Sequence, residues 1–187
     1  MKSIVKNPDS VIVTSGYQYP GNNTEILAAL DIEQDYFCAF TEEHLTPGFA
    51  RDVEHFDPTL KNTSADGYNN WFSASTRINR RKGSIPRWNR CQPSLYPTNP
   101  NLGTRLIYNN GHYIVPDPND DEAKNLRDFL FLNAFGQPIA RQAYINNLKT
   151  LLTLFQNDLE ELKAFLLNDP NSIKYRTAIN IELGIVL

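Results

Sequence analysis

Four polar residues between positions 54 and 79 could together activate a water molecule and hold a divalent metal ion. Glu54 and His55 are adjacent, Asn70 lies 15 residues after the histidine, and Asn79 lies 9 residues further on. His55 is the candidate general base, because a neutral imidazole can take the proton of an attacking water. Glu54 and Asn79 carry the oxygen ligands that a hard cation such as Mg²⁺ or Mn²⁺ prefers. Asn70 is expected to fix the His55 ring, so the set predicts metal-assisted hydrolysis of a phosphodiester.

A cationic segment surrounds the second of these asparagines. Residues 77–90 contain six of the chain's 18 Lys and Arg residues and no acid. The expected contacts to backbone phosphates are Arg77, Arg80, Arg81 and Lys82. The net charge of the whole chain is −3, so the segment predicts local engagement of nucleic acid, with DNA favoured, rather than tight and indiscriminate binding. A protein partner would then supply part of the affinity.

These residues need a small scaffold of strands and a helix to bring them together. The expected elements are a strand at 36–40, a turn at Thr46-Pro47-Gly48, a strand at 49–56, a polar loop at 62–67 and a helix at 69–81. The helix is predicted from the spacing of Trp71, Phe72, Ser75 and Ile78. In a regular strand Glu54 and His55 point to opposite faces, so a bulge or a strand end is needed for both to serve one site.

The rest of the chain is expected to frame this unit. The predicted elements are a short strand at 11–13, helices at 24–33, 120–133, 138–167 and 172–184, and a hairpin at 105–115 around Asn109-Asn110-Gly111. The predicted fold class is therefore α+β. An N-terminal arm and helix would occupy residues 1–35, a ββα core residues 36–85, and a hairpin with a helical extension residues 86–187.

Composition limits the class of protein. An apolar fraction of 41% and an aromatic fraction of 11% in 187 residues predict a packed core. The chain has no run of 18 apolar residues and no apolar stretch typical of a signal peptide near its start, so we expect a cytoplasmic protein without a membrane span. Two cysteines do not form a disulfide framework.

Three short motifs resemble those of the HNH endonucleases, whose nuclease core is a ββα-metal unit. They are Glu54-His55-Phe56-Asp57-Pro58, Tyr68-Asn69-Asn70-Trp71 and Asn79-Arg80-Arg81-Lys82-Gly83. This resemblance implies that His55 and Asn70 are catalytic, that Glu54 and Asn79 bind Mg²⁺ or Mn²⁺, and that the reaction is cleavage of nucleic acid.

Looser matches outside the motifs are similar to the small HNH proteins of retron and Septu antiphage systems, which are called PtuB-like. The matching residues are Ile4, Lys6 and Pro8, the segment Val115-Pro116-Asp117-Pro118, and Leu130-Phe131-Leu132-Asn133 with Arg141. Resemblance to that group implies a role in antiviral defence and a partner ATPase of the SMC/ABC type.

One departure from the family is sharp. The structural zinc of HNH proteins needs four thiolates, but these places hold Cys38, Thr41, Ser75 and Ile78. One thiolate cannot build a tetrahedral zinc site, so we predict no structural zinc. Cys38 is then expected to be a small buried residue. The residues predicted to pack where the metal would lie are Phe37, Phe40, Trp71, Phe72 and Ile78.

Two other readings stay open at this point. The lost thiolates are compatible with a non-catalytic subunit that binds nucleic acid, or acts as a scaffold, on a degenerate HNH fold. A toxin-like nuclease acting on RNA is also compatible with the sequence, and composition does not discriminate it from a DNA-cutting enzyme. Taken singly, the asparagines are typical of helix caps or exposed positions, and the arginine run is typical of a solvated helix end.

Overall fold

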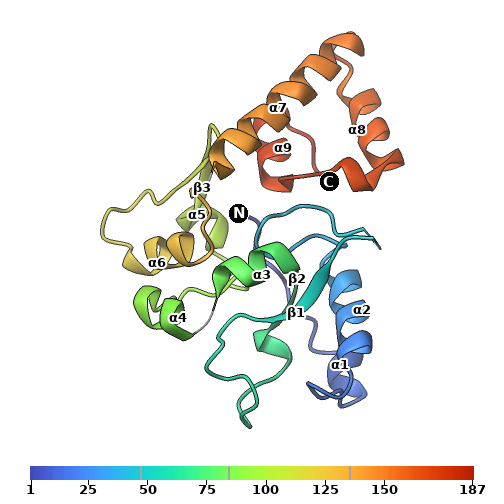
Figure 1. Ribbon diagram of the computed structural model, residues 1–187. Coiled ribbons are helices and arrows are strands. Elements are labelled where there is room, and N and C mark those ends of the chain that lie inside the picture. The colour runs from blue at the N-terminus through green and yellow to red at the C-terminus, as the bar shows by residue number, and fades with distance from the viewer. Residues whose placement is uncertain (47, 84, 135) are drawn as a thin grey trace.

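The computed structural model describes residues 1–46, 48–83, 85–134 and 136–187. Within these ranges, helices and two small antiparallel sheets form an α+β fold, as predicted (Figure 1). Pro47 of the predicted turn lies outside the described residues. No helix of the described ranges is both long enough and apolar enough to cross a bilayer.

Two strands and a helix form the centre of the fold. Strand β1 (Arg51–His55) pairs antiparallel with β2 (Trp71–Ser75), in a register that runs from Arg51 opposite Ser75 to His55 opposite Trp71. Helix α3 (Thr76–Lys82) follows β2 directly and packs against both strands. The order strand, strand, helix is therefore the predicted one, although its elements lie elsewhere in the sequence.

The predicted positions of the second strand and the helix were wrong. Residues 36–40 form a single bridge, Phe37 to His44, and not a strand. Strand β2 falls inside the predicted helix at 69–81, of which only the second half is helical. All five residues of β2 are buried, so the strand shows no alternation of apolar and polar residues, and its short apolar run could be taken for one face of a helix.

A long connection joins the two strands. Residues 56–70 leave the ladder after His55 and return to it through a turn of 3₁₀ helix, η1 (Tyr68–Asn70). The Phe56 amide donates to the Asn70 carbonyl oxygen at 2.9 Å, so the two ends of the connection are fixed to each other. This segment includes the predicted polar loop at 62–67.

The N-terminal helices cover one face of the β1–β2 pair. The predicted strand at 11–13 is instead helix α1 (Val11–Thr14), because the Ser10 side chain accepts from the Ile12 amide and starts a helical turn. Helix α2 (Asn23–Glu33) confirms the predicted helix at 24–33 and contacts both strands. Buried residues of this layer are Ile12, Ile26, Ala29, Leu30 and Trp71.

The middle of the chain holds short elements around the predicted hairpin. They are α4 (Ile85–Cys91), α5 (Leu102–Arg105), β3 (Ile107–Asn109), β4 (His112–Ile114) and α6 (Asp121–Phe129). The hairpin is confirmed: β3 pairs with β4, and both turn residues have positive φ, 44° at Asn110 and 84° at Gly111. The predicted helix at 120–133 is confirmed in its first part as α6.

The C-terminal region consists of helices that form a separate layer above the strands in Figure 1. Their bounds are α7 (Gln137–Leu154), α8 (Leu159–Asn168), η2 (Pro170–Ser172) and α9 (Arg176–Leu183). The single helix predicted at 138–167 was wrong, because Gln156 and Asn157 have positive φ and end it. Asp158 then caps α8 by accepting from the amides of Glu160 and Glu161.

The largest apolar cluster lies between α3, α6 and the C-terminal helices. It includes Cys38, which is buried as predicted, with Phe37, Phe40, Phe72 and Ile78. Trp71 differs from the prediction, since it packs on the opposite face of β2 with the N-terminal helices. The Ser75 amide lies 3.4 Å from Cys38 Sγ, and burial raises the pKa of the Cys38 thiol.

Candidate active site

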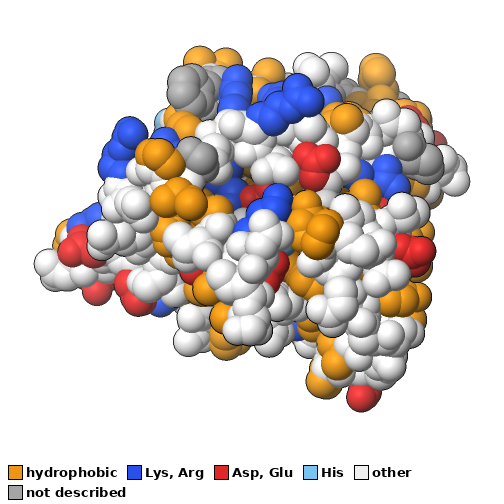
Figure 2. Space-filling view, turned by 60° about the horizontal axis from the view of Figure 1, so that its bottom comes forward, with side chains coloured by type: hydrophobic (Ala, Val, Ile, Leu, Met, Phe, Trp, Pro, Cys, Tyr) orange, Lys and Arg blue, Asp and Glu red, His pale blue; other side chains and the backbone are white. Residues whose placement is uncertain are grey.

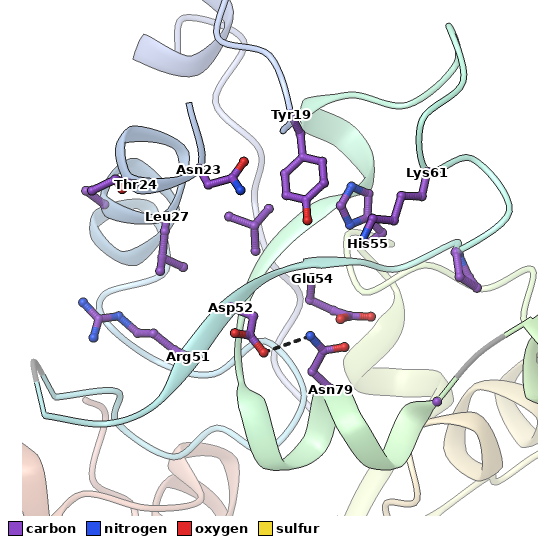
Figure 3. A pocket seen from close by; sticks show the side chains of 14 residues that line it. Tyr19, Asn23, Thr24, Leu27, Arg51, Asp52, Glu54, His55, Lys61 and Asn79 are labelled. Atoms are coloured by element: carbon purple, nitrogen blue, oxygen red, sulfur yellow. Dashed lines mark hydrogen bonds between the residues drawn. The ribbon is translucent and has the colours of Figure 1, made fainter. Parts of the chain in front are cut away.

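A groove runs along the free edge of β1. Among the described residues β1 pairs only with β2, so its other edge is open. The groove has a volume of about 570 Å³, and every residue of β1 lines it. The other lining residues are Tyr19, Asn23, Thr24, Leu27, Ala28, Pro58, Lys61, Asn79 and Gly83. Because the groove follows an edge, side chains from both faces of the strand reach it (Figure 3).

His55 is the last residue of β1 and lies at one end of this groove. Its side chain is 5% exposed, and its ring meets the Tyr19 ring edge-on with centroids 4.5 Å apart. Its Nε2 atom lies 2.9 Å from Asp66 Oδ2, in direct contact but without the direction of a well-formed hydrogen bond. An imidazole fixed by an aromatic ring and a carboxylate has the arrangement that a general base requires.

Asn70 acts on this histidine through Asp66 rather than by direct contact. Its Nδ2 donates to Asp66 Oδ1 and to the Asp57 carbonyl oxygen, each at 3.0 Å. Its Oδ1 accepts from the Asp57 amide at 2.7 Å, and the Trp71 indole also donates to Asp66 Oδ1. The expected fixing of the His55 ring by Asn70 is therefore corrected: Asn70 closes the connection and holds Asp66 against the ring.

Asp66 was not singled out by sequence reasoning. It lies in a polar loop where no periodicity distinguishes one acid from its neighbours. The only available signal was its position four residues before Asn70, which suits a local hydrogen bond between the two side chains.

Burial lowers the pKa of His55 below its usual value. The Asp66 carboxylate opposes this shift, and the nearby Lys61 ammonium adds to it. His55 is thus uncharged at neutral pH, which is the protonation state of a base about to accept a proton.

Glu54 points to the other face of β1, as the alternation of a regular strand predicts. Its carboxylate pairs with the Lys82 ammonium, and both side chains are buried. Burial raises the pKa of Glu54 to about 6, although the Lys82 cation opposes the shift. Burial likewise lowers the pKa of Lys82, against the effect of Glu54. Each ion of the pair therefore depends on the other for compensation of its lost hydration.

Lys82 is not placed as the expected phosphate contact. Its side chain is 1% exposed, and its Nζ donates to the carbonyl oxygens of His55 at 2.7 Å and Phe56 at 3.1 Å. Lys82 therefore ties the end of α3 to the end of β1. The sequence placed it at the end of a basic run, where a surface position was the natural expectation.

Asp52 is a further acid that sequence reasoning missed. It accepts a hydrogen bond at Oδ2 from Asn79 Nδ2, with a length of 3.0 Å (Figure 3). Asp52 and Glu54 are two residues apart on one strand, so they share the face that α3 covers. That i, i+2 spacing was visible in the sequence and could have identified it. Figure 3 shows Asp52, Glu54 and Asn79 on this side of β1, with Tyr19, His55 and Lys61 gathered near the strand's end.

The donor set of this face fits a hard divalent cation. Asp52 and Glu54 supply carboxylate oxygens and Asn79 an amide oxygen, which are ligands typical of Mg²⁺ and Mn²⁺. The amide must turn to present Oδ1 in place of Nδ2, and Glu54 must share its carboxylate with Lys82. In the described part of the chain no group of three or more His, Cys, Asp or Glu side chains converges as a metal site, so the asparagine is an essential member of this set.

The expected phosphate contacts differ in their surroundings. Arg80 and Arg81 are exposed in the last turn of α3, where the helix dipole favours cations. Arg77 is half-exposed and pairs with Glu43 at 3.2 Å. Figure 2 shows Lys and Arg side chains gathered on the upper part of one face, with a further cation near acidic side chains in its middle. A polyanion could therefore approach α3 without meeting a continuous acidic surface.

The site thus contains an oriented neutral imidazole, three oxygen donors and exposed arginines on one small unit. Comparison of the chain with protein-family models, with curated proteins and with solved structures found no match.

Proposed function

We propose that the protein is a metal-dependent endonuclease of the HNH type, whose ββα-metal core is formed by β1, β2 and α3. The observation that carries this proposal is that one groove brings His55, fixed by Asp66, beside the oxygen donors Asp52, Glu54 and Asn79. A general base on one face of an edge strand and hard ligands on the other can act on a phosphodiester placed along the edge.

The proton path begins at the imidazole. With the Nε2 hydrogen directed at Asp66, the uncharged His55 ring has its lone pair on Nδ1, and this atom accepts the proton of the attacking water. Asp66 then stabilises the imidazolium that forms. Tyr19 and Trp71 limit the motion of the ring.

The other residues position the phosphate. A divalent ion held by Asp52, Glu54 and Asn79 supplies stabilisation of the negative charge that develops on the phosphate and the leaving oxygen. Arg80 and Arg81 contact flanking phosphates and set the register of the strand. DNA is the favoured substrate, on the resemblance of the motifs.

Plasmid nicking tests the proposal. Purified protein is incubated with supercoiled plasmid and Mg²⁺ or Mn²⁺, beside His55→Ala and the matched control His112→Ala, a histidine exposed at the start of β4. Metal-dependent nicking that is lost only in His55→Ala supports the proposal. Nicking that persists equally in both variants would assign the activity to another residue or to a contaminant.

The cellular role proposed is that of a nuclease subunit in an antiphage system with an SMC/ABC-type ATPase. The C-terminal helices offer a surface for such a partner, since Ile139, Leu154 and Leu167 are largely exposed while other residues of the same helices form the core. Co-expression with an ATPase encoded beside this chain checks the role. Co-elution that is lost on Leu154→Asp supports it, and separate elution of two folded proteins contradicts it.

A non-catalytic subunit is the second candidate, and one contact favours it. The Lys82 ammonium pairs with the carboxylate that would bind the metal ion, which is the arrangement expected if no metal enters. Mn²⁺ titration of the wild type and of Asn79→Ala discriminates between the two. Nucleic-acid binding without Mn²⁺ binding would favour the second candidate, and Mn²⁺ binding that Asn79→Ala weakens would favour the nuclease.

A further inference from the structure

A second cavity lies apart from the groove and shares none of its lining residues. Its volume is about 900 Å³, within the size range of small-molecule sites. It lies between the N-terminal arm, the connection that follows β1, and residues 96–100. Its walls are mostly apolar and aromatic, with Val5, Leu60, Tyr68 and Tyr96 among them.

One buried cation, Lys6, also lines this cavity. Its ammonium donates to the Trp71 carbonyl oxygen and lies 4.4 Å from the centre of the Tyr68 ring and 4.3 Å from that of Phe72. It forms no ion pair with any carboxylate of the described residues. Glu33 acts on it only at longer range, and the two oxygens of Glu33 already accept from the hydroxyls of Ser10 and Tyr68.

A buried ammonium without a counter-ion is costly, because a carbonyl oxygen and two ring faces replace only part of its lost hydration. An anion entering the cavity would complete this environment. The rest of such a ligand would meet apolar and aromatic walls. We propose that this cavity binds a small aromatic anion, with its charged group paired with Lys6 and its ring system against Tyr68 and Tyr96.

The pH dependence of binding follows from the surroundings of Lys6. Burial lowers the pKa of Lys6 to about 7, with Glu33 opposing the shift. The hydroxyl of Tyr68 stays neutral, since burial and its bond to Glu33 raise the pKa of Tyr68 to about 12. A bound anion stabilises the protonated amine, so affinity should fall as pH rises above 7, by about tenfold per pH unit.

Two fluorescent probes of nearly equal shape separate the charge from the apolar walls. Anilinonaphthalene sulfonate carries an anion, and phenylnaphthylamine has the same ring system without it. The wild type should bind both, and Lys6→Met should weaken the sulfonate at least tenfold while leaving the neutral probe unchanged. Equal loss of both probes, or no dependence of sulfonate affinity on pH, would overturn the proposal.

The position of the bound probe is checked with matched substitutions. Ala65→Trp places a large ring at the cavity wall, and Ala164→Trp places the same ring on α8, away from it; both alanines are exposed. Sulfonate binding should be lost in Ala65→Trp and retained in Ala164→Trp, with far-UV circular dichroism showing that both are folded. Retention in both, or absence of saturable binding by the wild type, would contradict the proposed site.

Discussion

The Lys82 ammonium donates a hydrogen bond of 2.7 Å to the carbonyl oxygen of His55, and it pairs with Glu54 at the same time. One cation thus fixes the main chain of the candidate base and the side chain of a candidate ligand. Because Lys82 belongs to the last turn of α3, it also sets how the helix lies on the strands. The predictions below follow from this relationship and from its neighbours.

Lys82→Met should lower the free energy of unfolding by about 3–5 kcal/mol, because it leaves the buried Glu54 carboxylate without its partner. Urea denaturation measures this loss. Arg80→Met is the matched control, since it removes an exposed cation from the same turn and should change the free energy by less than about 0.5 kcal/mol. Equal effects of the two changes would show that the buried pair contributes nothing particular to the fold.

Asp66→Asn should lower the pKa of His55 further, because the carboxylate that favours the imidazolium is removed. Titration of the His55 ring by NMR measures the shift. The nicking rate should fall by about tenfold to a hundredfold, since the ring also loses its orienting partner. Asp117→Asn, at an exposed loop position, should change neither value. An unchanged His55 pKa in Asp66→Asn would mean that the contact is not electrostatic.

Affinity for Mn²⁺ should fall as pH decreases below about 6, because the raised pKa of Glu54 makes protons compete with the metal there. The sign follows from the requirement for an ionised ligand: the carboxylate is charged above its pKa and neutral below it. Isothermal titration calorimetry of the wild type against Glu54→Gln measures this. The variant should bind more weakly at neutral pH and lose this pH dependence; a parallel dependence in both would point to another ligand.

Arg80→Ala combined with Arg81→Ala should weaken binding of DNA of any sequence and make it less dependent on salt. The slope of log affinity against log salt should decrease by about one to two, since each lost phosphate contact releases fewer counterions. Fluorescence anisotropy over a salt series measures the slope. Lys149→Ala with Lys174→Ala, both exposed and distant from α3 in sequence, is the charge-matched control. A similar change in the control would mean that net charge alone decides binding.

The sequence was informative where a residue's role depends on near neighbours. Alternation along a strand placed Glu54 and His55 on opposite faces, and the Asn-Gly pair located the hairpin turn. Helix α2 followed from its cap and its apolar spacing. These features depend on local geometry, and local geometry is what residue spacing reports.

The remaining features depend on contacts between distant segments. Strand β2 is buried on both faces by α2 and the main core, so its own pattern could not distinguish strand from helix. Lys82 is buried because the main chain of residues 55–56 lies above its ammonium. Asp66 is functional in the proposed site only because the connection folds back on His55. None of these partners is close in sequence.

The connection between β1 and β2 has a further consequence. Its two ends are fixed by the bond from Phe56 to Asn70, and the Asn70 side chain clasps Asp57 just inside them. Doubling the length of a flexible loop costs only about 0.6 kcal/mol of closure entropy. Insertions between residues 58 and 65 should therefore be tolerated, provided that Asp66 keeps its place. Related chains could diversify this tip to reach new substrates while the residues that serve the reaction remain unchanged.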